Sequence, residues 1–219
     1  MADRILQILV QYICLLFCLS AHEAAHAAAA DRFGDHTARM LGRLTLNPIK
    51  HADPLGTFIL PLMMMITQFP FLFGWAKPVP VNIRNLRNPR LHSVFVAIAG
   101  PSANLLLAII FTFVLRLTVI INGISTPDEM FASPACLVSI SIVMINLVLL
   151  LFNCIPLPPL DGHHVLNYFL PPEGQRFLQQ MGPFGLIIAI TLGSRIISPP
   201  LHYIAGFLLT FGLTGFNLL

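Results

Sequence analysis

Long runs of apolar side chains alternate with shorter polar stretches along this chain. A membrane-spanning helix needs about 20 mostly apolar residues, because each residue advances it by roughly 1.5 Å across a hydrocarbon core of about 30 Å. Runs of this kind occupy residues 5–30, 91–121, 135–152, 181–197 and 201–219. The pattern predicts an all-α, polytopic integral membrane protein with about five to six membrane segments, folded as a single domain over residues 1–219.

A further apolar segment, residues 55–73, lies between two basic stretches. Its flanks are the polar loop 31–54 and the proline-rich stretch 74–90, which together hold Arg32, Arg39, Arg43, Lys50, Lys77, Arg84, Arg87 and Arg90. Cytoplasmic loops are enriched in Lys and Arg, so a single crossing would put half of these charges on the wrong side. We therefore favour a re-entrant hairpin bent at Pro61 or Pro70. The alternative is a true crossing that breaks the rule locally.

The composition agrees with a membrane protein. Only 10% of the residues are charged and 56% are hydrophobic, whereas a soluble domain carries about 25% charged residues. The net charge is +3, and no basic face with interleaved aromatic side chains indicates a nucleic-acid partner. The loop 122–134 holds Asp128 and Glu129 but no Lys or Arg, which suits the non-cytoplasmic side. The four cysteines form no C-x-x-C pair, and we expect them to be packing residues.

The first apolar run contains the motif His22-Glu23-Ala24-Ala25-His26. Residues four apart share one face of a helix, so the two imidazoles can bind one metal ion, and Glu23 beside them can take a proton from water. His22 lies about 26 Å along the run by helix rise, inside the membrane but near the exit face. Ionisable residues at such depth are costly and usually functional, so the motif predicts a hydrolytic metal site within the bilayer.

A catalytic zinc usually has three protein ligands, so a third must come from elsewhere. Asp31, Asp35 and Asp53 lie in the loop after the motif and could reach it. Asp161 stands out, because it ends the proline-rich segment 153–162 that follows a span running toward the same face as His26. Unwound backbone carrying a carboxylate at membrane depth is expensive unless it lines a site.

Other functions are compatible with the same residues. A membrane metal transporter could use His22, His26 and Asp161 as a transit site, although the other spans offer few ligands at other depths. A catalytically inactive scaffold is a third class, against which the intact Glu23 argues. Side-chain amides within the spans can also serve only to bridge helices by hydrogen bonds, as Asn104, Asn146 and Asn153 could do.

Three motifs together resemble a known family. His-Glu-Ala-Ala-His at 22–26, Gly-Pro-Ser-Ala-Asn at 100–104 and Asn-Cys-Ile-Pro-Leu-Pro-Pro-Leu-Asp-Gly at 153–162 are similar to the site-2 protease family of intramembrane metalloproteases. Residues 41–48, 53–56 and 73–82 resemble its compact branch, which lacks PDZ and CBS domains. The resemblance covers about residues 15–168.

This resemblance implies one Zn²⁺ per chain, bound by His22, His26 and Asp161, with Glu23 as the catalytic base. It implies that Asn104 lies near the active site and helps to handle substrate. We expect Asn104 and Asn153 either to handle substrate or to support the metal ligands from behind. The expected function is an intramembrane zinc metalloendopeptidase that cleaves transmembrane protein substrates within or near their membrane segments. The expected location is a bacterial or archaeal cell membrane, with the lipid bilayer as surroundings and the active site near the cytoplasmic face.

Overall fold

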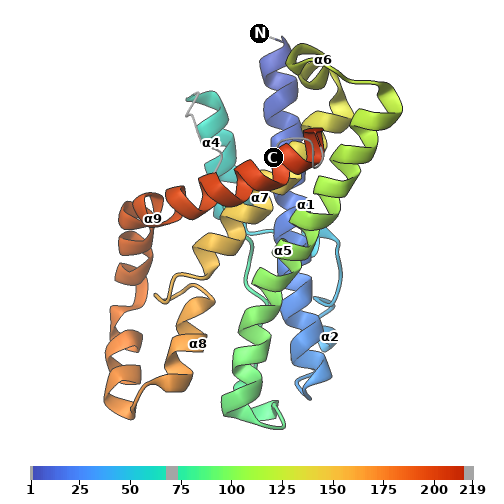
Figure 1. The fold of residues 1–219 in the computed structure, drawn as a ribbon. Helices are drawn as coiled ribbons and strands as arrows, with labels where there is room; N and C mark the ends of the chain where they lie inside the picture. The colour runs from blue at the N-terminus through green and yellow to red at the C-terminus, as the bar shows by residue number, and fades with distance from the viewer. Residues whose placement is uncertain (1, 68–73, 215–219) are drawn as a thin grey trace.

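The structure, a computed structural model, describes residues 2–67 and 74–214. Within those residues the fold is helical and holds no β-strand. The elements are α1 (Ala2–Arg32), α2 (Thr37–Met40), α3 (Pro48–His51), the π-helix η1 (Pro54–Ile59), α4 (Leu60–Ile66), the 3₁₀-helix η2 (Ile83–Asn85), α5 (Pro89–Asn122), α6 (Pro127–Ala132), α7 (Pro134–Asn153), α8 (Gly162–Phe169) and α9 (Pro172–Thr214). Figure 1 shows α1, α5 and α7 as a central bundle, with α9 bent around one side of it.

The predicted polytopic character is confirmed. Among residues 2–67 and 74–214, four helical segments are long and apolar enough to cross a membrane, namely Leu6–Arg32, Pro89–Asn122, Pro134–Asn153 and Arg195–Leu213. Two shorter apolar helices, Pro54–Met64 and Phe184–Gly193, accompany them. Each span begins or ends at polar or proline-rich sequence, which is why the boundaries predicted from the apolar runs lie within a few residues of those observed for α1, α5 and α7.

The bundle core is built from small and branched side chains that let the helices approach closely. Ala108 of α5 packs against Val143 and Leu147 of α7 and against Ala205 of α9. A second cluster joins α1 to α7 through three residues, Cys14, Cys18 and Ile142. Small residues at helix contacts are typical of membrane bundles, where packing and not water exclusion holds helices together. The cysteines at 14, 18 and 136 are buried and free, and that at 154 is exposed.

The two predicted C-terminal segments, 181–197 and 201–219, both fall on α9. This element has a non-helical residue at Gly182, with φ 43° and ψ −127°. Glycine adopts such a left-handed φ without steric cost, so the direction changes there. Pro199 and Pro200 stay within the helical element, as prolines can in membrane helices. Residues 215–219 of the second predicted segment lie outside the described residues.

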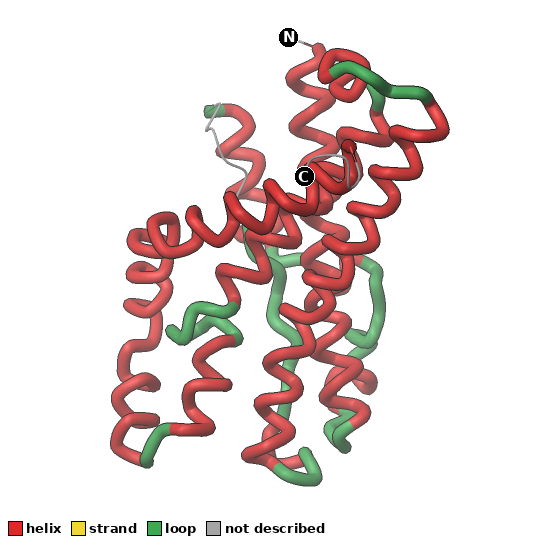
Figure 2. Tube along the Cα trace, in the orientation of Figure 1, coloured by secondary structure: helices red, strands yellow, loops and turns green. Residues whose placement is uncertain are grey.

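The described part of the segment 55–73 begins beside the bundle and extends away from it. In η1 the carbonyl of Thr57 accepts a hydrogen bond from the Tyr12 hydroxyl of α1 at 2.7 Å, whereas α4 stands apart from the other helices in Figure 1 and Figure 2. Just after the segment, the N–H of Trp75 donates to the carbonyl of Gly56 at 3.2 Å, and the Thr57 hydroxyl donates to the carbonyl of Trp75 at 2.9 Å. The two ends of the segment are therefore hydrogen-bonded to each other. Residues 68–73, which include one of the two predicted bend positions, lie outside the described residues.

Candidate metal centre

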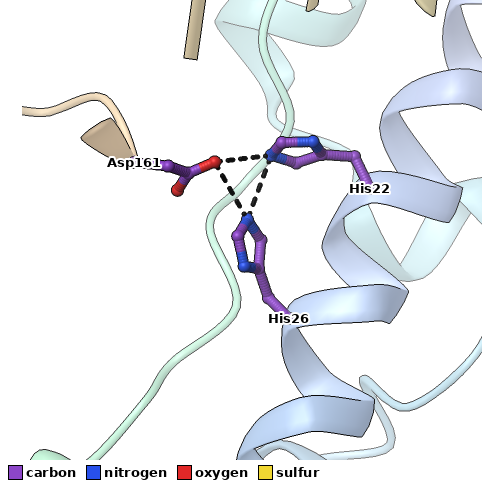
Figure 3. Close-up of side chains that lie close together, drawn as sticks. All are labelled: His22, His26 and Asp161. Atoms are coloured by element: carbon purple, nitrogen blue, oxygen red, sulfur yellow. Dashed lines mark hydrogen bonds and ion pairs between the residues drawn. The ribbon is translucent and has the colours of Figure 1, made fainter. Parts of the chain in front are cut away.

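Helix α1 turns both histidines of the H-E-x-x-H motif into the bundle. His22 is 5% exposed and His26 is 8% exposed. One helical turn separates them, and their Nε2 atoms lie 3.0 Å apart. Asp161 reaches the same point from the far end of the chain, with its Oδ2 atom 3.2 Å from each Nε2 (Figure 3). Among the described residues this is the one cluster of three His, Cys, Asp or Glu side chains with metal-binding geometry.

Asp161 ends the proline-rich loop that joins α7 to α8. The loop is held from behind by α9, against which Ile155 and Leu160 are buried. Gly162 follows Asp161 for a steric reason, since a Cβ there would lie 2.6 Å from the carbonyl oxygens of Cys154 and Ile155. The loop thus closes on itself so tightly that a glycine must follow the carboxylate.

The other nitrogen of each ring defines the tautomer. The Nδ1 atom of His26 lies 2.7 Å from the carbonyl oxygen of Val96, which can only accept, so Nδ1 carries the hydrogen. The Nδ1 atom of His22 lies 2.5 Å from the Oδ1 atom of Asn104, whose amide nitrogen is already used as a donor to Asn146. In both neutral rings, Nε2 is therefore an unprotonated lone-pair atom that faces the carboxylate.

This donor set fits a metal ion. Two unprotonated nitrogens and a carboxylate oxygen are all hydrogen-bond acceptors, so none of them can donate a hydrogen bond to another. In the described part of the chain, Oδ2 of Asp161 is buried without a hydrogen-bond partner. A shared cation resolves the conflict. A tetrahedral zinc with bonds of about 2.0–2.1 Å places its ligand atoms about 3.3 Å apart, close to the observed separations of 3.0 and 3.2 Å.

The main chain of α5 forms one wall of the centre. A Cβ at Gly100 would lie 2.3 Å from Nε2 of His26 and 2.6 Å from Cε1 of His22. Only glycine allows the helix to touch both rings. Pro101, which follows, has no N–H, so the carbonyl of Ala97 loses its helical partner, and Ala97 lines the adjoining cavity. The glycine of the Gly-Pro pair thus makes room for the rings, while the proline leaves the carbonyl of Ala97 without its helical donor.

Glu23 lies next to the three ligand candidates and faces the same cavity. Its Oε2 atom accepts the N–H of Val79 at 2.8 Å, from the irregular segment 74–82 that precedes η2. The cavity has a volume of about 600 Å³. Its lining includes His22, Glu23, Val79, Asn153, Asp161 and Leu186. A carboxylate, a candidate metal centre and room for a peptide segment therefore meet in one place.

The loop carboxylates that could have supplied the third ligand are used elsewhere. Asp31 pairs with Arg39 and with His36 at the surface. Asp53 caps the start of η1 by accepting the N–H groups of residues 55 and 56 at 3.0 and 2.7 Å. Asp161 is thus the carboxylate that the fold brings to the histidines.

Asp35 is fully buried and ties two loops together. Its carboxylate accepts hydrogen bonds from Thr37, from the N–H of Asn82 and from the amide of Asn85. Burial raises the pKa of Asp35, but the hydrogen bonds from Thr37, Asn85 and Asn82 outweigh it, so the net pKa is lowered. The bonds anchor the far end of the segment that carries Val79.

The predicted asparagines differ in what they touch. Asn104 contacts the His22 ring and is 0% exposed, whereas Asn153 lines the cavity and donates to the carbonyl of Leu149 in its own helix at 3.0 Å. Sequence reasoning missed the contact of Gly100 with the rings and that of the Val79 N–H with Glu23. The tight Gly-Pro pair was a signal for the first, but nothing local in the sequence marks the second.

Comparisons with known proteins were made on the whole chain. The sequence profile of peptidase family M50 matches residues 10–192. YwhC of Bacillus subtilis, by its name a candidate zinc metalloprotease, is 40% identical over 200 residues, which cover 87% of this chain and 84% of YwhC. The Rip2 proteins of Mycolicibacterium smegmatis and Mycobacterium tuberculosis, candidate zinc metalloproteases by name, are 31% and 32% identical and are covered over 66% and 63% of their length. No solved structure matches.

Proposed function

The chain belongs to peptidase family M50, and from this premise we propose that His22, His26 and Asp161 bind its zinc ion and that Glu23 is its general base. The convergence of two lone-pair nitrogens and one buried carboxylate oxygen within 3.2 Å, beside a cavity that Glu23 also faces, carries this assignment. The protein is an intramembrane zinc metalloprotease of the bacterial cell membrane. A metal transporter is not favoured, since the described residues offer one metal-binding cluster and not a series.

The chemistry divides between the metal and Glu23. Zinc, when bound, supplies Lewis-acid polarisation of a peptide carbonyl and acidifies water. The Glu23 carboxylate takes a proton from a water molecule in the cavity and passes it to the leaving amine. The N–H of Val79 orients this carboxylate by donating to one oxygen, which leaves the other free for the proton. The ring hydrogens on Nδ1 keep both histidines in the ligand tautomer.

The segment beside Glu23 offers an edge to an unwound substrate. The N–H groups of Trp75, Lys77 and Val79 all bond toward the protein body, to Gly56, to residue 51 and to Glu23. In an extended chain, alternate residues point the opposite way. Positions 78 and 80 on that opposite edge are prolines, which present carbonyl acceptors but no donors. A transmembrane substrate that unwinds next to this edge can donate its own N–H groups to it.

We also infer that residues 55–73 re-enter the membrane and that the site opens toward the cytoplasm. The hydrogen-bonded ends at Gly56 and Trp75 support the hairpin, since both basic flanks then share one side. The loop between α5 and α7 holds Asp128 and Glu129 and no Lys or Arg, which supports the opposite orientation for that end. Cysteines at positions 80–88 should react from the cytoplasmic side; labelling only from outside would contradict the hairpin.

Replacing Glu23 tests the assignment of the base. In detergent-purified protein, Glu23→Gln should lower the rate of cleavage of a transmembrane model substrate by about 10²–10⁴-fold, the usual contribution of a general base. Bound zinc, measured by elemental analysis, should stay at the parent level, because Glu23 is not a ligand candidate. Glu173→Gln, at an exposed position in the first turn of α9, is the matched control and should cleave normally. Parent-level cleavage by Glu23→Gln would refute the mechanism.

A further inference from the structure

A chain of buried amides leads from the candidate metal centre to α7. Asn104 and Asn146 are both 0% exposed. The amide nitrogen of Asn104 donates to the Oδ1 atom of Asn146 at 2.7 Å, and the Oδ1 atom of Asn104 meets Nδ1 of His22 at 2.5 Å. At the other end, the amide nitrogen of Asn146 donates to the carbonyl of Ile142 at 2.8 Å and contacts the sulfur of Cys18 at 3.0 Å. The chain joins α1, α5 and α7.

The direction of every hydrogen bond in this chain is determined at the Ile142 end. A main-chain carbonyl only accepts, so the side of Asn146 that faces Ile142 must be its nitrogen. Its oxygen then faces Asn104, which must present its own nitrogen there and its oxygen to His22. That oxygen accepts the Nδ1 hydrogen. The lone pair of the ring is thereby left on Nε2, the atom nearest Asp161.

We propose that Asn146 is a positioning residue for zinc binding, because it locks Asn104 in the orientation that holds His22 in the ligand tautomer. This inference rests on the proposed role of His22 as a ligand. Hydrogen bonds from the non-ligating nitrogen commonly determine the orientation and basicity of a metal-binding histidine. Here the lock is a neutral amide pair, which places no additional charge in the membrane interior.

The same contacts bear on the expected substrate-handling role of Asn104. Its oxygen and its nitrogen are both engaged, and the residue is absent from the lining of the cavity that holds Glu23 and Asp161. Asn153, in contrast, lines that cavity. The geometry assigns substrate contact to Asn153 and ring orientation to Asn104 with Asn146.

Zinc affinity of the purified protein, measured by competition with a chromophoric chelator, tests the inference. Asn146→Ala should raise the zinc dissociation constant by about 10–100-fold, the usual cost of losing such a partner. Ser139→Ala is the matched control, because this buried α7 serine bonds only to its own helix and should leave the affinity unchanged. If Asn146→Ala folds poorly, Asn146→Ser replaces it in the measurement. Serine keeps a small polar group but cannot reach Asn104, so we expect the same rise of about 10–100-fold in the zinc dissociation constant.

A double replacement separates positioning from simple packing. Asn104→Asp alone places a carboxylate oxygen against the Oδ1 atom of Asn146. Both atoms are acceptors and repel each other, so this variant should bind zinc more weakly. Asn104→Asp combined with Asn146→Ala should bind zinc more tightly than either single variant, because both carboxylate oxygens accept and no orienting partner is needed. Additive losses in the double variant, or parent affinity in Asn146→Ala, would overturn the proposal. His22→Ala tests the premise: if it binds zinc as the parent does, the proposed ligand set itself fails.

Discussion

The two halves of the proposed metal site are supported by different kinds of structure. His22 and His26 lie on a 31-residue helix, and their rings are hydrogen-bonded from behind by α5. Asp161 lies at the end of a short loop, its side chain is 19% exposed, and no donor from behind holds its carboxylate within the described chain. The packing of its loop against α9 holds Asp161 in place instead. The histidine half is therefore oriented by hydrogen bonds from α5, and the aspartate half by the packing of its loop against α9.

The largest effect should come from disturbing the histidine half directly. Gly100→Ala puts a Cβ within 2.3 Å of Nε2 of His26, so the helix or the imidazole ring must shift. A displacement of about 1 Å at a catalytic centre can cost 10²-fold, so cleavage should fall by about that factor or more. Zinc content should fall with it. Gly206→Ala in α9, where a Cβ meets nothing within 4 Å, is the control and should cleave normally.

A smaller effect should come from the aspartate half. Gly185→Ala in α9 puts a Cβ 2.2 Å from the carbonyl oxygen of Pro158, three residues before Asp161. The loop has to shift, and we expect zinc affinity and cleavage to fall by about 10-fold, at the low end for a group that supports a ligand. Gly193→Ala, on the same helix but with its nearest contact at 3.5 Å, should be neutral. If both variants behave alike, packing by α9 does not position Asp161.

The smallest effect on the site should come from the loops around the end of α1. Asp35→Asn removes a buried charge that accepts four hydrogen bonds, at a cost of about 2 kcal/mol in unfolding free energy. Asp35 contacts none of the proposed zinc ligands, so cleavage at low temperature should change little. Thermal unfolding in detergent at pH 7 should nevertheless occur earlier than in the parent.

The pH dependence of that difference has a definite sign. The pKa of Asp35 is lowered in the folded protein, so its stabilisation is complete above the unfolded pKa of about 3.9 and is lost as the pH falls through the folded value. The gap in melting temperature between parent and Asp35→Asn should therefore be constant near neutral pH and narrow below about pH 4. A gap that widens on acidification would contradict the lowered pKa.

The features that could be predicted from the sequence are those that depend on neighbouring residues. The apolar runs gave the spans, and the four-residue spacing placed His22 and His26 on one face, because both patterns follow from helix geometry. Asp161 stood out by its place in the proline-rich segment, but the residues alone left Asp31, Asp35 and Asp53 open, and only the family resemblance implied Asp161 as the third ligand. Composition and spacing carry no information about which loop meets which helix.

The contacts that could not be predicted join residues far apart in the chain. Asn104 and Asn146 are 42 positions apart, and Val79 is 56 positions from Glu23. Periodicity within a helix says which face is apolar but not which neighbour it meets. The left-handed φ at Gly182 was not predicted for another reason: a single glycine within a helical pattern does not by itself mark a break.

The separation of Asp161 from the H-E-x-x-H motif also has a consequence for biosynthesis. A nascent chain that has emerged only as far as α5 already carries His22, Glu23 and His26, yet it lacks the carboxylate that completes the donor set. The proposed ligand set can therefore be complete only after α7 and the loop that follows it have been synthesised. We expect a chain that ends before this loop to bind zinc weakly and to be inactive, because it lacks one of the three proposed ligands.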